Sequence, residues 1–147
     1  MRLLAATDFA LRVLMVLRRQ PAGRPLSVEM LARELGGLSR HHLHKIVQEL
    51  TALGVTRTTR GIAGGVALAV DPATLQLGTL MRRLESRQPL VECFRGQGCT
   101  CTLVSECGLK GMLRQAEDRF YAALDEHTLA ECVPSEGVTH APPTRGG

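Results

Sequence analysis

The sequence lacks tryptophan, and aromatic residues make up only 3% of its 147 positions. Hydrophobic residues nevertheless account for 44% of the chain, so leucine, valine, isoleucine, methionine and alanine must fill the core. Because aromatic side chains favour sheets, their scarcity favours a mainly helical protein. The length suits one domain, or one domain with a dimerisation arm.

Long hydrophobic runs are also missing. No apolar stretch approaches the roughly 18–20 residues that span a bilayer, and the acidic Asp8 comes too early for a signal peptide. We therefore expect a cytoplasmic protein with no membrane partner. In that compartment the five cysteines are expected to be reduced, which favours metal ligation or redox sensing over disulfides.

Positive charge is concentrated in the first part of the chain. Residues 1–60 hold ten Lys and Arg against four Asp and Glu, whereas residues 61–147 hold eight against ten. A basic segment of this kind is typical of proteins that bind phosphate backbones, although a soluble basic surface would look the same. No nucleophile elbow, phosphate loop or substrate-pocket motif is visible, so we do not expect an enzyme.

Helical patterns dominate the first 54 residues. Thr7 and Asp8 predict the start of a helix that ends near Arg19. Ser27 is a good N-cap for a second helix, which Gly36 and Gly37 would stop, and a third helix should begin at Ser39 and end at Gly54. Two short helices joined by a glycine turn indicate a helix-turn-helix.

Two extended segments follow, at 55–59 and 66–70, around a glycine-rich loop. A hairpin in this position indicates a wing. A helix over 77–85 and a long amphipathic helix from about Ser105 to Leu129 come next. The expected fold class is therefore mainly α, with the following divisions: a winged helix-turn-helix DNA-binding domain at 1–76, a connecting helix and cysteine loop at 77–104, a dimerisation helix at 105–133 and a disordered tail at 134–147.

The third helix and the hairpin provide the candidate DNA-reading surface. Arginine and lysine suit guanine, glutamine suits adenine, and hydroxyl or imidazole groups can donate to phosphates. Glycine lets the wing backbone come close, and flanking arginines suit a narrow minor groove. A solvated helix face and an ordinary tight hairpin are the alternatives. The candidate residues are Ser27, Ser39, Arg40, His41, His42, His44, Lys45, Gln48, Arg57, Arg60, Gly61, Gly64 and Gly65.

Four cysteines lie close together, in the pattern Cys93-x5-Cys99-x-Cys101-x5-Cys107. Thiolates suit iron–sulfur clusters and also zinc, and the spacing leaves both open. An iron–sulfur electron carrier or enzyme is a further alternative, but it would leave the basic helix-turn-helix unexplained. Cys132 lies outside the loop and is interpreted as an ordinary packed or exposed thiol.

Three segments resemble the NsrR/IscR family of iron–sulfur winged-helix regulators. Residues 7–12 resemble its opening, residues 38–47 its recognition helix, and residues 60–68 its wing, with Arg-Gly, two residues, then Gly-Gly. The resemblance extends to about residue 133. Val66 and residues 90–93 and 128–133 look most like the nitric-oxide-sensing NsrR branch, and the lack of a histidine in 108–111 argues against IscR-type ligation.

This resemblance implies a homodimeric repressor that binds a pseudo-palindromic double-stranded DNA operator and responds to nitric oxide. It implies an iron–sulfur cluster, with 4Fe–4S favoured over 2Fe–2S. Cys93 and Cys107 are the safest ligands, and Cys101 is favoured over Cys99 between them. Asp8 of the opposite subunit matches a fourth ligand, although an acid in the first turn of a helix has an equally good structural role. A regulator with another signal, or one with structural zinc, remains the alternative.

Overall fold

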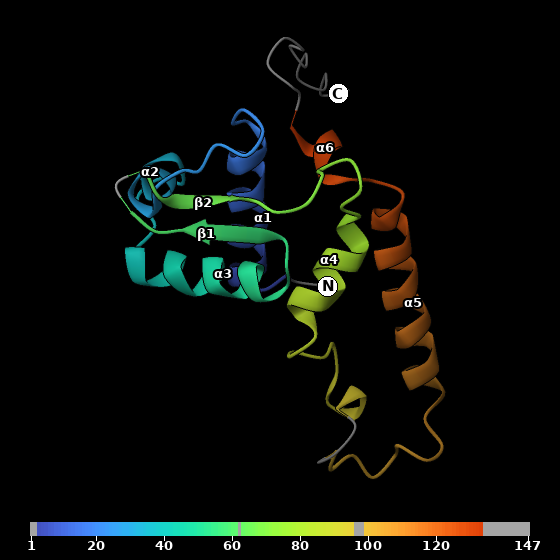
Figure 1. Ribbon diagram of the computed structural model, residues 1–147. Helices are drawn as coiled ribbons and strands as arrows, with labels where there is room; N and C mark the ends of the chain where they lie inside the picture. Colours follow the sequence, from blue (N-terminus) through green and yellow to red (C-terminus); the bar gives the residue numbers. More distant parts are fainter. Residues whose placement is uncertain (1–2, 62, 96–98, 134–147) are drawn as a thin grey trace, which may run out of the picture.

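The computed structural model describes residues 3–61, 63–95 and 99–133. The predicted disordered tail at 134–147 lies outside the described residues. Helices form most of the structure, together with one hairpin (Figure 1). In chain order the elements are α1 (Ala5–Arg18), α2 (Val28–Glu34), α3 (Arg40–Ala52), β1 (Thr56–Thr59), β2 (Gly65–Leu68), α4 (Leu77–Glu85), the 3₁₀ turn η1 (Glu92–Phe94), α5 (Gly108–Asp125) and α6 (Leu129–Cys132).

The first helix begins earlier than its sequence suggests. α1 starts at Ala5, after Leu4, so the predicted start at Thr7 is wrong. Thr7 is only 1% exposed, because it faces the core from inside the helix rather than capping its end. Asp8 does lie in the first turn, where its charge complements the helix dipole.

Local signals set the ends of the next two helices as predicted. The Ser27 hydroxyl accepts a hydrogen bond of 3.2 Å from the Met30 amide, and Ser39 does the same for His42. Gly37 and Gly54 adopt positive φ angles of 84° and 75° just beyond the helices, a conformation that glycine enters without steric cost. The helix-turn-helix is thus built from its own capping residues.

The hairpin packs directly behind this unit. β1 and β2 are antiparallel, with Thr56 opposite Leu68 and Thr59 opposite Gly65. The main chain of Val66 also exchanges two hydrogen bonds, of 2.8 and 2.9 Å, with Leu26 in the loop between α1 and α2. The predicted wing is therefore present, and it is fastened to the segment that enters α2.

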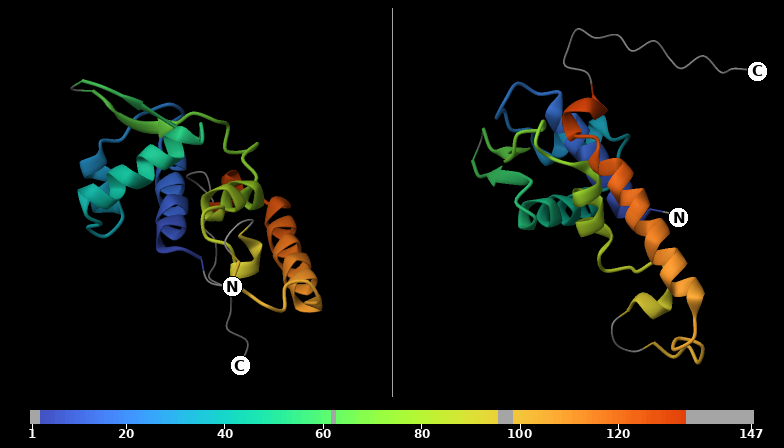
Figure 2. Two further views of the ribbon diagram at one scale, coloured as in Figure 1. Left: turned by 90° about the horizontal axis from the view of Figure 1, so that it is seen from below. Right: turned by 90° about the vertical axis from the view of Figure 1, so that its right-hand side faces the viewer.

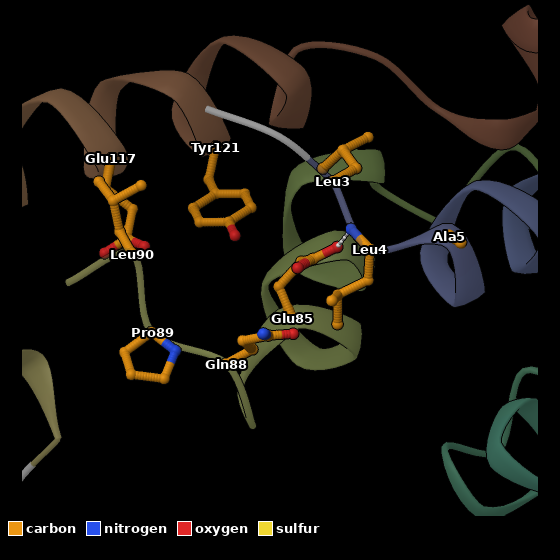
Figure 3. A pocket seen from close by; sticks show the side chains of 9 residues that line it. All are labelled: Leu3, Leu4, Ala5, Glu85, Gln88, Pro89, Leu90, Glu117 and Tyr121. Carbon is orange, nitrogen blue, oxygen red and sulfur yellow. Dashed lines mark hydrogen bonds between the residues drawn. The ribbon is translucent and has the colours of Figure 1, made fainter. Parts of the chain in front are cut away.

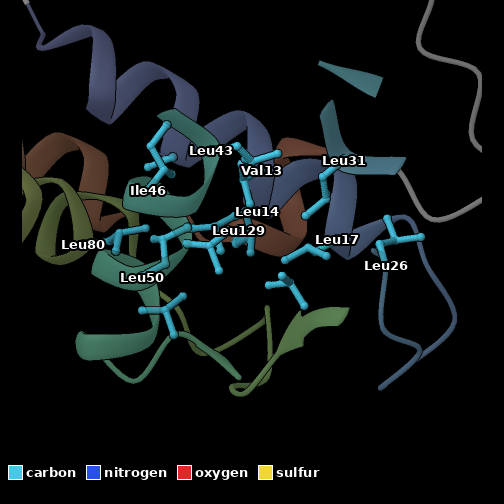
Figure 4. Packing of buried hydrophobic residues seen from close by; sticks show 14 of the residues in the cluster. Val13, Leu14, Leu17, Leu26, Leu31, Leu43, Ile46, Leu50, Leu80 and Leu129 are labelled. Atoms are coloured by element: carbon cyan, nitrogen blue, oxygen red, sulfur yellow. The ribbon is translucent and has the colours of Figure 1, made fainter. Parts of the chain in front are cut away.

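One apolar core joins the elements of the first domain. Figure 4 shows leucines from α1, α2 and α3 meeting Leu80 of α4 and Leu129 of α6. α4 lies between α1 and α5 (Figure 2), and α5 extends beside α4 away from the hairpin. Among the described residues, no helix is long and apolar enough to cross a membrane.

The C-terminal helices differ from the single helix predicted over 105–129. α4 has the predicted bounds, but α5 begins only at Gly108, because residues 102–106 form turns, and it ends at Asp125. The Leu129 amide then donates to the Leu75 carbonyl at 3.0 Å, which draws the chain back toward the start of α4. A separate short helix, α6, follows, with a capping box made by Thr128 and Glu131.

Candidate nucleic-acid interface and cysteine loop

α3 has two distinct faces. Leu43, Ile46, Val47 and Leu50 are buried against the core. The predicted DNA-reading residues of this helix are all exposed, namely Ser39, Arg40, His41, His42, His44, Lys45 and Gln48. α3 therefore presents a polar, positively charged surface that is held rigidly by the packing of its opposite face.

Arg40 contacts an acid of the preceding helix. Its Nη2 lies 3.4 Å from Oε1 of Glu29, and Arg33 contacts the same oxygen at 3.3 Å. The side chains of Arg40 and Glu29 are 70% and 54% exposed. Exposed pairs of this kind contribute little free energy, so Arg40 can exchange Glu29 for a phosphate or a base at small cost.

A groove runs between α3 and the hairpin. His44 and Gln48 of α3 line this groove together with Arg60 of the wing. Thr51, Thr58 and Thr59 also line it and were not among the predicted residues. Their signal was weak, because Thr51 is a half-buried residue of α3 and exposed threonines such as Thr58 and Thr59 are ordinary in a short strand. The structure thus joins part of the recognition helix and part of the wing in one surface.

The arginines of the wing occupy different positions. Arg60 and Gly61 are exposed where the chain leaves β1, and Ile62 beside them lies outside the described residues. Arg57 lies opposite Ala67, two pairs back from the Thr59–Gly65 end of the ladder. Its guanidinium donates to the main chain at Leu68 and Gly23. Arg57 therefore does not flank the tip, as the sequence suggested.

Gly64 and Gly65 are required by the fold of the hairpin itself. A Cβ at Gly65 would overlap the carbonyl oxygen of Leu26, and one at Gly64 would overlap the carbonyl oxygen of Thr59. Gly61 has a φ of 105° and provides the turn. Close backbone packing within the protein thus explains the glycine pair without any contact to DNA.

Ser27 and Ser39 cap helices through their hydroxyl oxygens, which accept hydrogen bonds and leave the O–H hydrogens able to donate. Each oxygen accepts one backbone hydrogen bond. A hydroxyl group can accept and donate at the same time, so both can still donate to a phosphate from a helix N-terminus.

The cysteine loop connects η1 to α5. All five cysteines are thiols, and Cys93, Cys99 and Cys107 are half-buried whereas Cys101 and Cys132 are exposed. Cys93 lies in η1 and Cys107 is the N-cap residue of α5. Within residues 3–61, 63–95 and 99–133, no three Cys, His, Asp or Glu side chains are grouped closely enough to share a metal ion.

Polar contacts order the start of this loop. The Glu92 carboxylate accepts hydrogen bonds from the Thr100 amide, at 3.1 Å, and from its hydroxyl group, at 3.0 Å. These bonds hold the pKa of Glu92 below its ordinary value. They also bring together Glu92 and Thr100, the residues directly before Cys93 and directly after Cys99. Arg114 of α5 lies over the Phe94 ring at 4.6 Å and ties η1 to the helix.

Asp8 is engaged within its own helix. Arg12 Nη2 lies 2.9 Å from its Oδ2, and Arg12 Nε donates to Oδ1 at 3.1 Å. Binding a metal through Asp8 would therefore require this exposed ion pair to open or to share the carboxylate.

A cavity separates the N-terminus of α1 from α4 and α5 (Figure 3). Glu85 at the end of α4 accepts a hydrogen bond of 3.0 Å from the amide of Leu4, and Glu117 and Tyr121 line the side formed by α5. Burial, followed by the charges of Glu117 and Glu85, raises the pKa of Tyr121. The bond from Glu85 links the helix that precedes the cysteine loop to α1, the first helix of the reading head, by which we mean the helix-turn-helix and wing from Ala5 to Leu68.

α5 carries an apolar stripe that faces away from α4. Leu109 and Met112 are 59% and 69% exposed, and Phe120 is also exposed. Ala116 and Ala123 complete a stripe at helical spacing, whereas Tyr121 is the buried residue of the helix. Contiguous exposed apolar surface of this kind marks an interaction site.

The chain is similar to known transcriptional regulators over most of its length. A family model described as "Rrf2: Iron-dependent Transcriptional regulator" matches residues 3–135. The HTH-type transcriptional regulator NsrR of Geobacillus kaustophilus is 39% identical over 133 residues, 90% of each chain, and NsrR of Bacillus subtilis is 35% identical over 92% of each.

Two solved structures share the fold. CymR, the global cysteine regulator of B. subtilis, matches with a TM-score of 0.69 and 24% identity over 90% of this chain and 95% of its own. IscR of T. potens matches with a TM-score of 0.68 and 21% identity over 90% and 85%. With the hairpin that follows the helix-turn-helix, these matches confirm the predicted mainly helical, winged fold.

Proposed function

Because the chain belongs to the Rrf2 family of transcriptional regulators, we propose that this DNA-binding repressor releases its operator in response to nitric oxide, through an iron–sulfur cluster held by the cysteine loop. The observation that carries the proposal is the joint presence of an exposed basic recognition helix and a four-cysteine loop in a chain 35–39% identical to NsrR regulators.

DNA binding would use the exposed face of α3 together with the wing. Arg40, His41, His44, Lys45 and Gln48 are placed to meet base edges in the major groove, with Ser27, Ser39 and His42 near phosphates. Arg60 and Gly61 extend to the adjacent minor groove. The groove shared by His44, Gln48 and Arg60 supports a single continuous surface.

A homodimer would place two such surfaces on the half-sites of a pseudo-palindrome. The apolar stripe of α5 supports this assembly, because Leu109, Met112 and Phe120 would otherwise remain in water. A second copy that packs its own stripe against this one buries both.

The donor set of the loop fits an iron–sulfur cluster. Four thiols lie within fifteen residues, and soft thiolates are the ligands that such clusters use. Cys93, Cys101 and Cys107 would hold it, with Cys99 as the alternative to Cys101. Asp8 of the partner subunit would complete the set, and we favour a 4Fe–4S cluster over 2Fe–2S. When bound, the cluster supplies iron that reacts with nitric oxide.

The protein connects the loop to the reading head through α4 and α5. Cys93 follows α4, whose Glu85 is bonded to the amide of Leu4 at the start of α1. Cys107 precedes α5, which packs along α4. A structural change in the loop would therefore be transmitted to α1. Two alternative arrangements of these helices would give two different distances between the reading heads of the two subunits.

Operator binding by protein purified without air provides the test. We expect holo-protein to bind the operator tightly, and stoichiometric nitric oxide to weaken that binding strongly. The iron content and visible spectrum of the same sample would report the cluster and its type. Unchanged affinity after nitric oxide, with cluster present, would reject nitric oxide as the signal; iron depletion or oxidant would then be applied to the same sample.

Single serine substitutions would identify the ligands. Cys93→Ser and Cys107→Ser should abolish iron incorporation. Cys101→Ser should do so as well, whereas Cys99→Ser should retain iron; the reverse pattern would make Cys99 the middle ligand. A colourless wild-type protein with one zinc per chain would contradict the iron–sulfur assignment.

A further inference from the structure

Arg57 joins the wing to the loop that precedes α2. It lies in β1, and its Nη1 donates to the carbonyl oxygen of Leu68 in β2 at 2.8 Å. Its Nη2 donates to the carbonyl oxygen of Gly23, 34 positions earlier in the chain, at 3.4 Å. We call these two hydrogen bonds the Arg57 clasp. They connect β1, β2 and the loop between α1 and α2.

The loop is shaped to receive this guanidinium group. Gly23 has a φ of 76°, and the amide of Arg24 donates to the carbonyl oxygen of Pro21 at 2.9 Å to close the turn. A Cβ at Gly23 would lie 3.3 Å from Arg57 Nη2, so a larger residue would crowd the clasp. The turn thus presents a carbonyl oxygen and leaves room for the arginine that binds it.

The clasp is the second of two attachments between the wing and this loop. The first is the pair of main-chain hydrogen bonds between Leu26 and Val66. The hairpin also packs on α1 and α3, with Val66 buried and the hydroxyl of Thr56 3.0 Å from that of Thr51. The clasp adds a contact at Leu68, two residues beyond Val66, and so further constrains the angle of the hairpin relative to the loop that enters α2.

We propose that Arg57 is a positioning residue that holds the wing at the angle needed for operator binding, and that it does not itself contact DNA. This inference rests on the proposed DNA-binding function. Arg60 and Gly61 lie only three and four residues further along the same strand and turn, so a small rotation at Arg57 displaces the residues that would enter the minor groove.

Arginine suits this role better than lysine. Its planar guanidinium group presents several donors in a fixed fork and can span two carbonyl oxygens at once, whereas an ammonium group is a compact point charge. Both acceptors are neutral, so the positive charge of Arg57 is not cancelled. A role in positioning and a role in phosphate binding therefore predict different effects for substitutions that keep or remove that charge.

The experiment measures operator affinity of anaerobic holo-protein at several salt concentrations, with a duplex that the wild-type protein selects from a random pool. The variants are Arg57→Lys, which keeps the charge, Arg57→Gln, which removes it, and Gly23→Ala, which crowds the clasp and strains the turn that presents the Gly23 carbonyl oxygen. Arg60→Gln is the reference for loss of a DNA contact. Thermal unfolding of each variant shows that it is folded.

We expect Arg57→Lys, Arg57→Gln and Gly23→Ala each to weaken binding about three- to ten-fold, the size of one or two lost hydrogen bonds. The slope of log affinity against log salt concentration should stay at the wild-type value for all three variants. Arg60→Gln should reduce the steepness of this slope by about 0.9, the value for one lost phosphate contact. The operator affinity of the double variant Arg57→Lys, Gly23→Ala should lie within about two-fold of the affinity of either single variant, because both substitutions break the same clasp.

Two results would overturn the proposal. If Arg57→Lys binds like the wild type while Arg57→Gln lowers the salt slope by about one contact, Arg57 is a phosphate ligand. If all three variants bind like the wild type, the clasp has no role in operator binding. Failure of wild-type holo-protein to select any duplex would instead contradict the proposed function, and is recognised before any variant is made.

Discussion

The Asp125 carboxylate, at the end of α5, accepts a hydrogen bond of 2.5 Å from the backbone amide of Thr79 in the first turn of α4. One helix thus caps another. The N-cap residue of α4, Gln76, instead donates its side-chain amide to the carbonyl oxygen of Asp125 at 3.3 Å. The end of α5 and the start of α4 are therefore joined by two hydrogen bonds, both accepted by Asp125.

Replacing Asp125 with alanine should lower the free energy of unfolding by about 1 kcal/mol, the usual effect of losing a helix cap. Urea unfolding followed by circular dichroism would measure it. Glu126→Ala is the matched control, because it removes an exposed acid at the next position. Equal losses in the two variants would show that charge, not the contact with Thr79, is responsible.

Gly78→Ala should destabilise the protein by about 1–3 kcal/mol, the usual cost of overpacking. A Cβ at Gly78 would overlap the carbonyl oxygen of Tyr121, so α4 and α5 approach each other closely at this position. Gly111→Ala in α5 provides the comparison, because among the described residues its Cβ would meet no atom within 4 Å. That variant should be up to about 1 kcal/mol more stable. Similar unfolding midpoints for the two variants would contradict this close approach.

Glu29→Gln should strengthen operator binding by about two- to five-fold at low salt, because Arg40 would no longer have to leave a weak ion pair. Fluorescence anisotropy with labelled operator would measure the change. Glu34→Gln, on the same helix and exposed, removes the same charge and should have a smaller effect. The advantage of Glu29→Gln should shrink as salt rises. An equal gain in both variants would assign the effect to net charge.

Met112→Lys should weaken the homodimer by about ten-fold or more, because it would bury an unpaired charge in the apolar stripe of α5. Ala122→Lys adds the same charge at an exposed position of this helix outside the apolar stripe and should leave the dimer intact. Sedimentation equilibrium of both variants gives the two dissociation constants. A dimer that tolerates Met112→Lys would place the interface elsewhere.

Glu131 should make the attachment of α6 sensitive to acid. Its carboxylate contacts His127 at 2.8 Å and accepts bonds from Thr128, and these contacts hold its pKa below the ordinary value of 4.5. Because the folded-state pKa is lowered, the stabilisation is complete well above pH 4.5 and is lost as the pH falls through the folded-state value. The urea midpoints of wild type and Glu131→Gln should therefore differ at neutral pH and converge in acid. A constant difference across this range would exclude the carboxylate as its source.

Short-range signals in the sequence predicted much of the reading head. Ser27, Ser39 and Gly54 act within three or four residues, so the bounds of α2 and α3 follow from local chemistry. Thr7 misled the prediction for α1, because a threonine suited to capping can also be buried when the core requires it. Local preference gives way to tertiary packing in that case.

Features that depend on distant partners were not predictable. The end of α5 depends on the bond between Leu129 and Leu75, and the role of Arg57 depends on Gly23. Neither pair of residues, so far apart in the chain, is marked by a recognisable pattern in the sequence. The exposed polar face of α3 was predictable because it lies opposite an obvious apolar stripe. The choice between Cys99 and Cys101 stays open, because it depends on a ligand arrangement that spacing alone does not determine.

The length of α5 relates movements of the cysteine loop to the tilt of this helix against α4. Its 18 residues extend for about 27 Å at 1.5 Å per residue, with Cys107 at one end and Asp125, fastened to α4, at the other. If that fastened end acts as a fulcrum, a tilt of about 5° corresponds to a displacement of about 2 Å at the loop, within the range of helix shifts that switch other proteins. A shift of about 2 Å among the cysteines would then tilt the whole of α5.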